Sequence, residues 1–322
     1  MRPPSQISGR DGSPNSPRMP RGGIPIGVLL TYLAFLLSGC LRTEPHSDTN
    51  RMRLVSTAPN LTECIFAVGA GALLVGRTES CDYPAEAVSH IPVTGGFGTP
   101  YLEPLLAVRP THVLETVLSD PDLKRRLDAL RIPVVHVPCA RLDEVPSAIR
   151  QIGALTGHSN EADRVAATLR AGVDAARANA SAQTNHPRVL LLFAADTPIT
   201  AGRHAFISEL LGLAGGINIG NGSDTDYYHF SLEWLLTQDP DMILCLFATP
   251  VRDPVTLFEN QTGWSALSAV RQRRVYTVPD LDTVSRPGPR LLEGLLQLKQ
   301  LLAFDSRRFD SSHVGSGRSQ PN

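Results

Sequence analysis

The fold of this chain is decided by Leu102-Glu103-Pro104-Leu105-Leu106, a phrase that is followed by Pro110 and Leu114. A second copy begins 130 residues later as Leu232-Glu233-Trp234-Leu235-Leu236, followed by Pro240 and Leu244. Such agreement in register rarely arises by chance and indicates an internal repeat. Each copy is typical of a short helix that ends before proline and leads into an apolar strand, at residues 112–115 and 242–246. The sequence therefore predicts two lobes built to one plan, each presenting a glutamate at the matching place.

Length and composition allow two cores and argue against a polyanionic partner. The chain has 322 residues, 42% of them apolar, and a formal net charge of −1. This is enough material for two lobes of about 100 to 150 residues each. Nucleic-acid binding needs concentrated Lys and Arg, and no basic run is present, so we expect no nucleic acid as partner.

The N-terminus is typical of an export signal. Residues 24–37 carry no charge and follow Arg18 and Arg21. A stretch of 14 residues is shorter than the roughly 20 residues of a membrane span, but it suits the apolar region of a signal peptide. Leu37-Ser38-Gly39-Cys40 resembles the bacterial lipobox, which implies lipidation of Cys40 and removal of residues 1–40 as a lipoprotein signal peptide. Met1 and Met19 both stay open as the start.

The lipobox resemblance also implies where the protein resides. Residues 41–52 are mostly polar and are predicted to form a tether between lipid and lobe. We expect a periplasmic protein held to the cell envelope by its lipid anchor, and Leu41 is compatible with sorting to the outer membrane.

Four further cysteines, Cys64, Cys81, Cys139 and Cys245, leave the disulfide state open. Export permits a disulfide, but four cysteines allow three pairings. Buried free thiols and one bridge are both compatible with the sequence, and Cys64 and Cys81 are the nearest pair along the chain.

Strand and helix patterns alternate along both halves, which favours α/β lobes with parallel-sheet cores. Residues 53–157 are predicted to form the N-terminal lobe and residues 187–304 the C-terminal lobe. Between them, residues 158–183 have helical apolar spacing, with Asn160 and Asp163 as a plausible capping pair. The expected architecture is two Rossmann-like lobes joined by one long central helix, with a ligand cleft between them. Residues 305–322 are predicted to be a disordered tail.

Local phrases resemble a known family. Residues 56–63, Ser-Thr-Ala-Pro-Asn-Leu-Thr-Glu, followed by Gly69, resemble the opening strand and helix of the siderophore, haem and cobalamin family of periplasmic substrate-binding proteins. Cys81-Asp82-Tyr83-Pro84 with Gly95-Gly96-Phe97 is most similar to the cobalamin-binding branch. The resemblance covers residues 53–304 and implies a monomer that carries no intrinsic cofactor, captures a large ligand between its lobes and delivers it to an ABC permease dimer with ATPase subunits.

The same resemblance implies a role for the repeated glutamates. In this family, paired glutamates meet arginines on the two permease subunits, and Glu103 and Glu233 are the matching positions here. A two-fold partner presents equivalent surfaces, so matched carboxylates on two lobes would set the orientation of docking. A glutamate in the first turn of a helix is also favoured by the helix dipole alone, by about 0.3 to 1 kcal/mol. Docking and a purely local helix role therefore both stay open.

In open α/β sheets, ligands lie beyond the carboxyl ends of the strands, so the loops there are the candidates for binding. The predicted ligand-binding residues are Asp82, Tyr83, Phe97, Tyr101, Tyr227, Tyr228, Asp280 and Arg286. The run Tyr227-Tyr228-His229-Phe230 is expected in a polar loop, where aromatic faces could lie against a macrocycle or simply pack between loops. Asp280 and Arg286 could contact corrinoid amides or pair with each other. No metal site is expected, although His229 is kept as a candidate iron or cobalt ligand.

No enzyme is expected, because no GxSxG, HExxH or Walker sequence occurs. The favoured ligand is a corrinoid such as cobalamin, and a ferric siderophore or haem is the alternative. A ligand sensor without transport and a chelatase-like enzyme are more remote alternatives.

Overall fold

The computed structural model of the chain describes residues 51–117, 120–249 and 251–314, with side chains up to Ala303. The N-terminal lobe contains β1 (Leu54–Ser56), α2 (Pro59–Ala67), η1 (Gly71–Leu73), β2 (Leu74–Thr78), α3 (Ala85–Ser89), β3 (Val93–Gly96), β4 (Thr99–Pro100), α4 (Leu102–Ala107), β5 (His112–Glu115), α5 (Pro121–Ala129), β6 (Val134–His136) and α6 (Val145–Thr156). The connecting helix is α7 (Ser159–Ala182). The C-terminal lobe contains β7 (Arg188–Ala194), β8 (Ile199–Ala201), α8 (Phe206–Ala214), β9 (Ile217–Asn218), η2 (Ile219–Gly222), β10 (Tyr227–His229), α9 (Leu232–Gln238), β11 (Met242–Cys245), η3 (Pro254–Leu257), η4 (Trp264–Ala266), α10 (Ser268–Arg271), β12 (Val275–Thr277), α11 (Leu281–Ser285) and α12 (Leu291–Val314).

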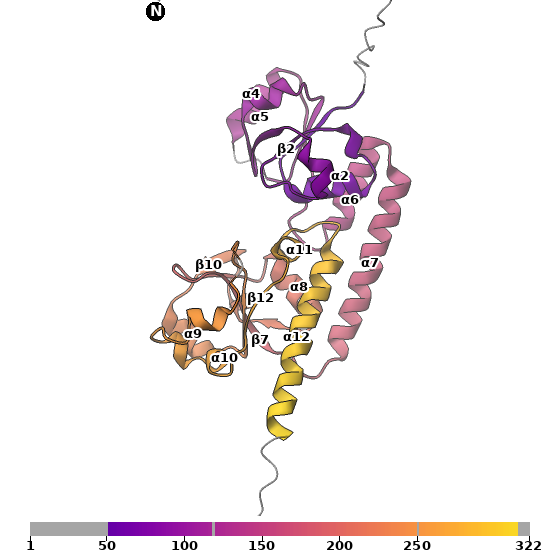
Figure 1. Cartoon of the computed structure of the whole chain (residues 1–322). Coiled ribbons are helices and arrows are strands. Elements are labelled where there is room, and N and C mark those ends of the chain that lie inside the picture. Colours follow the sequence, from indigo (N-terminus) through magenta and orange to yellow (C-terminus); the bar gives the residue numbers. More distant parts are fainter. Residues whose placement is uncertain (1–50, 118–119, 250, 315–322) are drawn as a thin grey trace, which may run out of the picture. The chain divides into compact units, whose positions relative to one another are not determined.

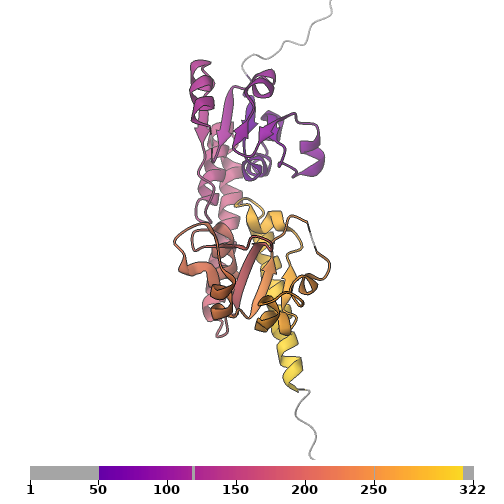
Figure 2. The same cartoon turned by 90° about the vertical axis from the view of Figure 1, so that its left-hand side faces the viewer.

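Each lobe is built around its own mostly parallel sheet, as the alternating pattern predicts (Figure 2). The first sheet has the strand order β4-β3-β2-β1-β5-β6, and only β3 and β4 pair antiparallel. The second has the order β10-β8-β7-β11-β12, with β9 added beside β7. There β8 is antiparallel to both β7 and β10. The strands predicted at residues 112–115 and 242–246 are the parallel strands β5 and β11, which lie inside their sheets and are buried along nearly their whole length.

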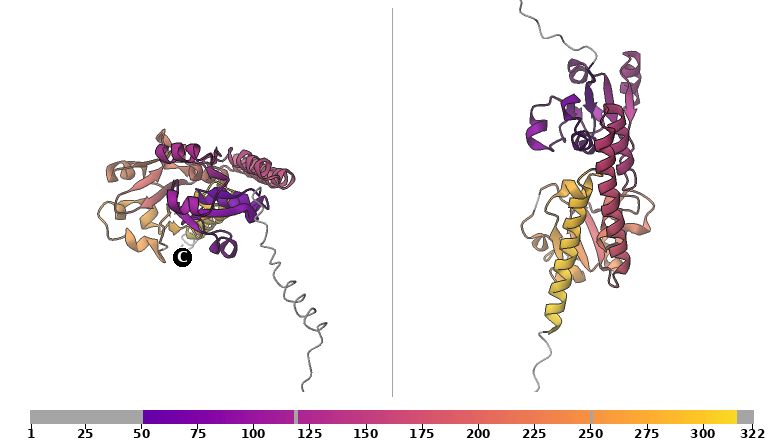
Figure 3. Two further views of the ribbon diagram at one scale, coloured as in Figure 1. Left: turned by 90° about the horizontal axis from the view of Figure 1, so that it is seen from above. Right: turned by 90° about the vertical axis from the view of Figure 1, so that its right-hand side faces the viewer.

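The helix α7 ties the two lobes together (Figure 1). It packs against α6 of the first lobe and against α8 and α12 of the second, and Figure 3 shows it beside α12. One apolar cluster runs through this region from Leu54 in β1, through Ala166 and Leu169 of α7, to Leu298 of α12. Since both lobes share this core, their relative orientation is held by buried side chains and not by a flexible linker.

The repeat is reproduced in backbone detail. The strand β5 spans the residues predicted for it, and its counterpart β11 starts 130 residues later. Just before each strand stands a non-glycine residue in the left-handed region, Arg109 with φ 45° and Asp239 with φ 36°, again 130 positions apart. Glycine adopts this region readily and other residues rarely do. The two lobes therefore share an unusual turn as well as a sequence pattern.

Several local predictions need correction. The helix α7 begins at Ser159 after His158, which gives no side-chain cap, and Asp163 instead pairs with Arg150 at 2.8 Å. The Asn160–Asp163 capping pair is therefore wrong. The aromatic run predicted as a polar loop contains the strand β10, because Tyr227 to His229 pair with the short strand β8.

The end of the second lobe also differs from the prediction. The backbone of α12 is helical to Val314, beyond Phe304, where the C-terminal lobe was predicted to end. Neither proline nor glycine interrupts residues 305–314, so nothing in that stretch forces the helix to end. Residues 315–322 of the predicted tail, Cys40, the signal peptide and residues 41–50 of the tether lie outside the described residues.

The four cysteines from Cys64 onward are free and buried, so the Cys64–Cys81 pairing is absent. Cys81 instead lies 3.1 Å from both Thr62 Oγ1 and Thr78 Oγ1. Cys64 is hydrogen-bonded to Cys139, and this contact, together with burial, raises the pKa of the Cys64 thiol. Across the described part of the chain, no helix is both long and apolar enough to cross a membrane.

Candidate functional site

The two repeated glutamates lie in the first turn of matching helices. Glu103 follows Tyr101 and opens α4, while Glu233 follows Ser231 and opens α9, and both glutamates are exposed. Ser231 Oγ accepts a hydrogen bond from Trp234 N at 3.2 Å. A backbone hydrogen bond and then a hydrogen bond to Ser231 lower the pKa of Glu233. Figure 1 shows α4 and α9 on the side of each lobe that is turned away from α7.

A cavity of about 610 Å³ opens between the lobes, at the carboxyl ends of the first lobe's strands and beside the β8–β10 edge of the second sheet. The first lobe contributes loops that follow β1, β2, β3, β5 and β6; the second contributes the loop after β8, the start of β10 and the end of α11. Its lining residues are Pro59, Asn60, Ser80, Phe97, Thr116, Val117, Cys139, Ala140, Arg141, Glu144, His204, Ala205, Phe206, Asp226, Tyr227, Ser285, Arg286 and Pro287. Its volume lies within the range of ordinary small-molecule sites, about 300 to 1,000 Å³.

Three of the eight predicted ligand-binding residues line this cavity: Phe97, Tyr227 and Arg286. Phe97 and Tyr227 are about half exposed and come from opposite lobes. The ring of Tyr227 is held edge-on against Phe193, with 5.2 Å between the centroids. Burial first, and then the charge of Asp226, raise the pKa of the Tyr227 phenol, so the neutral form is favoured.

The other five predicted residues lie outside the cavity lining. Tyr101 is 64% exposed beside α4, and Tyr228 donates to Gly220 O at 3.3 Å. The ring of Tyr83 lies under the guanidinium of Arg290 at 4.1 Å. Asp280 caps α11 by accepting from Asp282 N at 3.0 Å, and Asp82 belongs to the ion cluster described next. His229, the candidate metal ligand, is likewise absent from the cavity lining and pairs with Ile199 in the sheet.

A cluster of charged residues joins the lobes at one wall of the cavity. Arg286 Nη1 lies 2.6 Å from Asp82 Oδ1, and Arg286 Nη2 lies 2.7 Å from Asp282 Oδ1. Burial acts to raise the pKa of Asp82, but hydrogen bonding to Arg286 and its charge outweigh burial and lower it. Glu63 in α2 accepts from Arg290 at 2.7 and 2.9 Å. Asp82 of the first lobe and Arg286 of the second lobe thus pair with each other across the boundary between the lobes.

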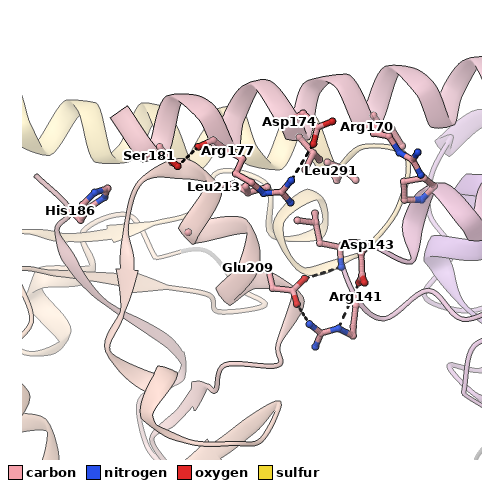
Figure 4. Close-up of a pocket in the computed structure, with 16 residues that line it drawn as sticks. Arg141, Asp143, Arg170, Asp174, Arg177, Ser181, His186, Glu209, Leu213 and Leu291 are labelled. Atoms are coloured by element: carbon pink, nitrogen blue, oxygen red, sulfur yellow. Dashed lines mark hydrogen bonds and ion pairs between the residues drawn. The ribbon is translucent and has the colours of Figure 1, made fainter. Parts of the chain in front are cut away.

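A second ionic contact bounds the cavity where Arg141 lies. Arg141 pairs with Glu209 of α8, whose other oxygen accepts from Leu142 N at 3.0 Å. Figure 4 shows this pair among the residues that line a second cavity, of about 700 Å³, between α7 and α8. That cavity is larger, but most of its lining is helical, from α6, α7, α8 and α12. We therefore place the ligand site in the interlobe cavity, where the carboxyl ends of the first lobe's strands face the second lobe.

Two polar residues of the interlobe cavity, Thr116 and His204, were not predicted as ligand contacts. Thr116 Oγ1 is buried and has no hydrogen-bond partner among the described residues. His204 lies between charges, with Nε2 2.8 Å from Asp224 Oδ1 and Nδ1 3.4 Å from Arg141 Nη1. Within the described residues, no group of three or more His, Cys, Asp or Glu side chains is arranged to hold a metal ion.

The sequence reasoning also missed Glu63, Arg290 and Cys139. Glu63 carried no usable signal, because it lies two positions from Leu61 and Ile65 and therefore points away from the face of α2 that these apolar residues share. It is buried nonetheless, and a buried carboxylate requires a partner, which Arg290 supplies. Cys139 carried no signal either; it reaches Pro287 O at 3.1 Å because the second lobe folds back over it.

Comparison with known proteins agrees with this architecture. The vitamin B12-binding protein of Pectobacterium carotovorum subsp. carotovorum (strain PC1) is 30% identical over 282 residues, which are 86% of this chain and 97% of that protein. The apo haem-binding protein RhuT of Roseiflexus sp. RS-1 superimposes with a TM-score of 0.68 at 27% identity, over 78% of this chain and 98% of the other. The vitamin B12-binding protein BtuF of Vibrio cholerae has a TM-score of 0.67 at 24% identity, over 79% and 97%, and supports the fold.

The family assignment follows from the sequence itself. The signature described as "Periplasmic binding protein" matches residues 54–281, from the first strand of the first lobe to the start of α11. It therefore covers both sheets and the helix that joins them. This chain belongs to the periplasmic binding protein family.

Proposed function

We propose that this protein is the lipid-anchored, monomeric substrate-binding component of an ABC importer, and that it captures a corrinoid between its lobes. Members of the family serve as binding components beside a permease and its ATPase subunits. The proposed anchor is Cys40, which would hold the protein at the envelope on the periplasmic side. No catalytic role is proposed, since its relatives are binding proteins of transport systems.

The observation that carries the choice of ligand is that the arginines lining the interlobe cavity are already paired. Arg286 faces Asp82, Asp282 and Glu63, and Arg141 faces Glu209. An anionic ligand would have to compete with these carboxylates, and breaking a partly buried ion pair is costly. A corrinoid carries neutral amides at its periphery, so it can bind without breaking these ion pairs.

Neutral contacts in the cavity suit such a ligand. Phe97 and Tyr227 offer aromatic faces from two lobes to a flat macrocycle. The buried hydroxyl of Thr116 has no partner among the described residues, and a ligand amide would satisfy it once the side chain turns toward the cavity. The 30% sequence identity with a vitamin B12-binding protein also supports a corrinoid as the ligand.

Haem is the second candidate, because His204 and Tyr227 both line the cavity and are residue types that bind haem iron. Before binding iron, His204 would have to give up a hydrogen bond and Tyr227 would have to lose its phenolic proton. His204 already uses both ring nitrogens, and the raised pKa of Tyr227 disfavours the phenolate. A ferric siderophore is less favoured still, because the anionic chelate would need unpaired arginines.

Calorimetric titration of the purified protein with cyanocobalamin, haemin and a ferric siderophore tests the choice. We expect micromolar or tighter binding of cyanocobalamin and weaker binding of the other two. Tight haemin binding with a Soret band typical of axial Tyr or His ligation, without cobalamin binding, would replace the corrinoid by haem.

Docking to the permease through Glu103 and Glu233 is the second part of the proposal. Both carboxylates are exposed at matching places, and hydrogen bonding lowers the pKa of Glu233, which further favours its charged form. The Glu103→Arg, Glu233→Arg double variant should lose stimulation of the importer's ATPase while keeping its ligand affinity. A protein that binds ligand but never stimulates an importer would instead be a sensor.

A further inference from the structure

An arginine stands at the start of the first strand of each lobe, Arg53 just before β1 and Arg188 at the first position of β7, and its side chain reaches the end of the helix that carries the exposed glutamate. In the first lobe, Arg53 Nη2 donates to Val108 O at 2.8 Å and Arg53 Nε donates to Arg109 O at 2.9 Å. These carbonyls lie just past the C-terminal end of α4, whose N-terminal turn holds Glu103. The backbone of Arg53 is fixed as well, because its N donates to Thr111 Oγ1 at 2.8 Å and its O accepts from Thr111 N at 2.8 Å.

The second lobe repeats part of this pattern. Arg188 Nη1 donates to Gln238 O, and Gln238 lies 130 positions after Val108, although Arg188 itself lies 135 positions after Arg53. The backbone N of Arg188 donates to Asp241 Oδ2 at 2.8 Å, and its O accepts from Asp241 N at 2.9 Å. The Nε contact to the next carbonyl is not repeated, because Arg188 Nη2 donates to Gln238 Oε1 at 2.9 Å instead. In both lobes, however, an arginine donates to a carbonyl at the C-terminal end of the helix and is fixed by the same backbone pairing.

The two helices benefit from such an attachment because each is short. The helix α4 has six residues and α9 has seven, and each has one fully buried residue, Leu105 and Leu235. Further apolar residues are only partly buried against the two cores: Leu102 and Leu106 in α4, and Leu232 and Trp234 in α9. The ends of each helix are therefore held less firmly than its middle. A guanidinium that grips the last carbonyls supplies a second point of attachment and satisfies groups that the helix leaves unpaired.

We infer that Arg53 and Arg188 are positioning residues that fix the separation and direction of Glu103 and Glu233 toward a partner with two-fold symmetry. This inference rests on the proposed docking role of the two glutamates. Orienting them before contact lowers the ordering cost of association, so loosening either helix should weaken docking without touching the ligand.

The separation of the two helices can be measured without the partner. Spin labels attached to a ketone-bearing amino acid at positions 103 and 233 of the full chain leave the cysteines untouched, and pulsed dipolar spectroscopy then gives the distance distribution. We expect Arg53→Gln and Arg188→Gln each to broaden the distribution, and Arg125→Gln, an exposed arginine paired within α5, to leave it unchanged. Equal widths in all four proteins would overturn the inference.

A second experiment links the arginines to docking. Affinity for the importer in nanodiscs should fall about tenfold in Arg53→Gln, equivalent to about 1.4 kcal/mol, with cyanocobalamin affinity and melting temperature unchanged. In a Glu103→Gln background the same substitution should add no further loss, because it acts through that carboxylate. A full additional loss would assign Arg53 a general structural role and overturn the inference.

A folding defect and a failure of the docking proposal can each be distinguished from a failure of this inference. If Arg53→Gln does not fold, Arg53→Lys keeps the charge but not the forked donation, and it should still broaden the distance distribution; an unbroadened distribution would again contradict the inference. If Glu103→Gln and Glu233→Gln leave importer affinity intact, the docking proposal fails, while the distance measurement still decides whether the arginines hold the helices.

Discussion

Glu63 Oε1 lies 2.7 Å from Arg290 Nη2, and the two residues belong to different lobes and stand 227 positions apart. The side chain of Glu63 is 2% exposed and that of Arg290 is 11% exposed. A second hydrogen bond of 2.9 Å from Arg290 Nε makes the pair bidentate. A carboxylate buried this deeply is tolerated because the guanidinium matches both of its oxygens.

Removing this carboxylate should therefore be strongly destabilising. In Glu63→Gln, Arg290 would keep its charge in a buried place with only the longer contact to Asp280, at 3.4 Å, as its ion pair. Breaking a buried pair costs roughly 3 to 5 kcal/mol, and the remaining contact puts the expected loss at the lower end of that range. Urea unfolding followed by circular dichroism measures the loss. The matched control is Glu161→Gln, since Glu161 pairs with Arg164 on the exposed surface of α7, and such pairs contribute about 0 to 1 kcal/mol. Equal stabilities of the two variants would contradict a structural role for the interlobe pair.

The neighbouring aspartates predict opposite pH dependences. The pKa of Asp82 is lowered from its ordinary value of 3.8, so its contribution to stability is present above that pH and is lost as the pH falls through the lowered pKa. Asp82→Asn should thus weaken the protein at pH 7 and match it near the acid end. Because the Asp82 side chain is 57% exposed, the difference should be small.

For Asp282 the sign is reversed. Burial first, opposed by Arg286 and reinforced by Asp82 and Asp280, raises its pKa above 3.8. Its favourable contribution is present below pH 3.8 and is lost as the pH rises through the raised pKa. Relative to the unsubstituted protein, Asp282→Asn should therefore gain stability as the pH rises. Melting temperatures measured from pH 3 to 7 check both variants, and parallel curves for the two would contradict the assignment.

The sequence predicts the parts of this fold that depend on local pattern. The bounds of β5, the proline start of α2 and the glycine stop of α6 at Gly157, with φ 77°, follow from apolar runs and capping rules. The strands β8, β9 and β10 have two or three residues each, and they exist because a neighbouring strand pairs with them. Such strands carry too little periodicity to be seen in the sequence.

The candidate site is predicted only in part, for a related reason. Residue type and loop position point to Phe97 and Tyr227, and both residues line the cavity. They cannot show that Arg286 turns toward Asp82, 204 positions away, because that contact depends on how the second lobe closes over the first. Which charged side chains of the site are paired depends on tertiary contacts. In this protein, the pairing of Arg286 is what bears on the choice of ligand.

The aromatic residues of the cavity give a direct test of ligand capture. Phe97→Ala and Tyr227→Ala should each lower cyanocobalamin affinity about tenfold, or about 1.4 kcal/mol, since aromatic contacts dominate such interfaces. Tyr227→Phe should retain most of the affinity, because the ring and not the hydroxyl makes the contact. Calorimetry measures all three, with Leu296→Ala, an exposed residue of α12, as control. Unchanged affinity in both alanine variants would place the ligand elsewhere.

The two left-handed turns of the repeat should respond differently to glycine. Arg109 and Asp239 both adopt φ values that cost a non-glycine residue about 1 kcal/mol or more. For Arg109 the hydrogen bonds of the turn are made by its backbone N and O, which a glycine retains, so Arg109→Gly should raise the free energy of unfolding by about 0.5 to 1 kcal/mol. Asp239 accepts from Ser268 N and Ser268 Oγ, both at 2.7 Å, so Asp239→Gly loses these bonds and should be neutral or destabilising. Urea unfolding of the two variants side by side measures the contrast, and equal gains would show that the Ser268 contacts contribute nothing to stability.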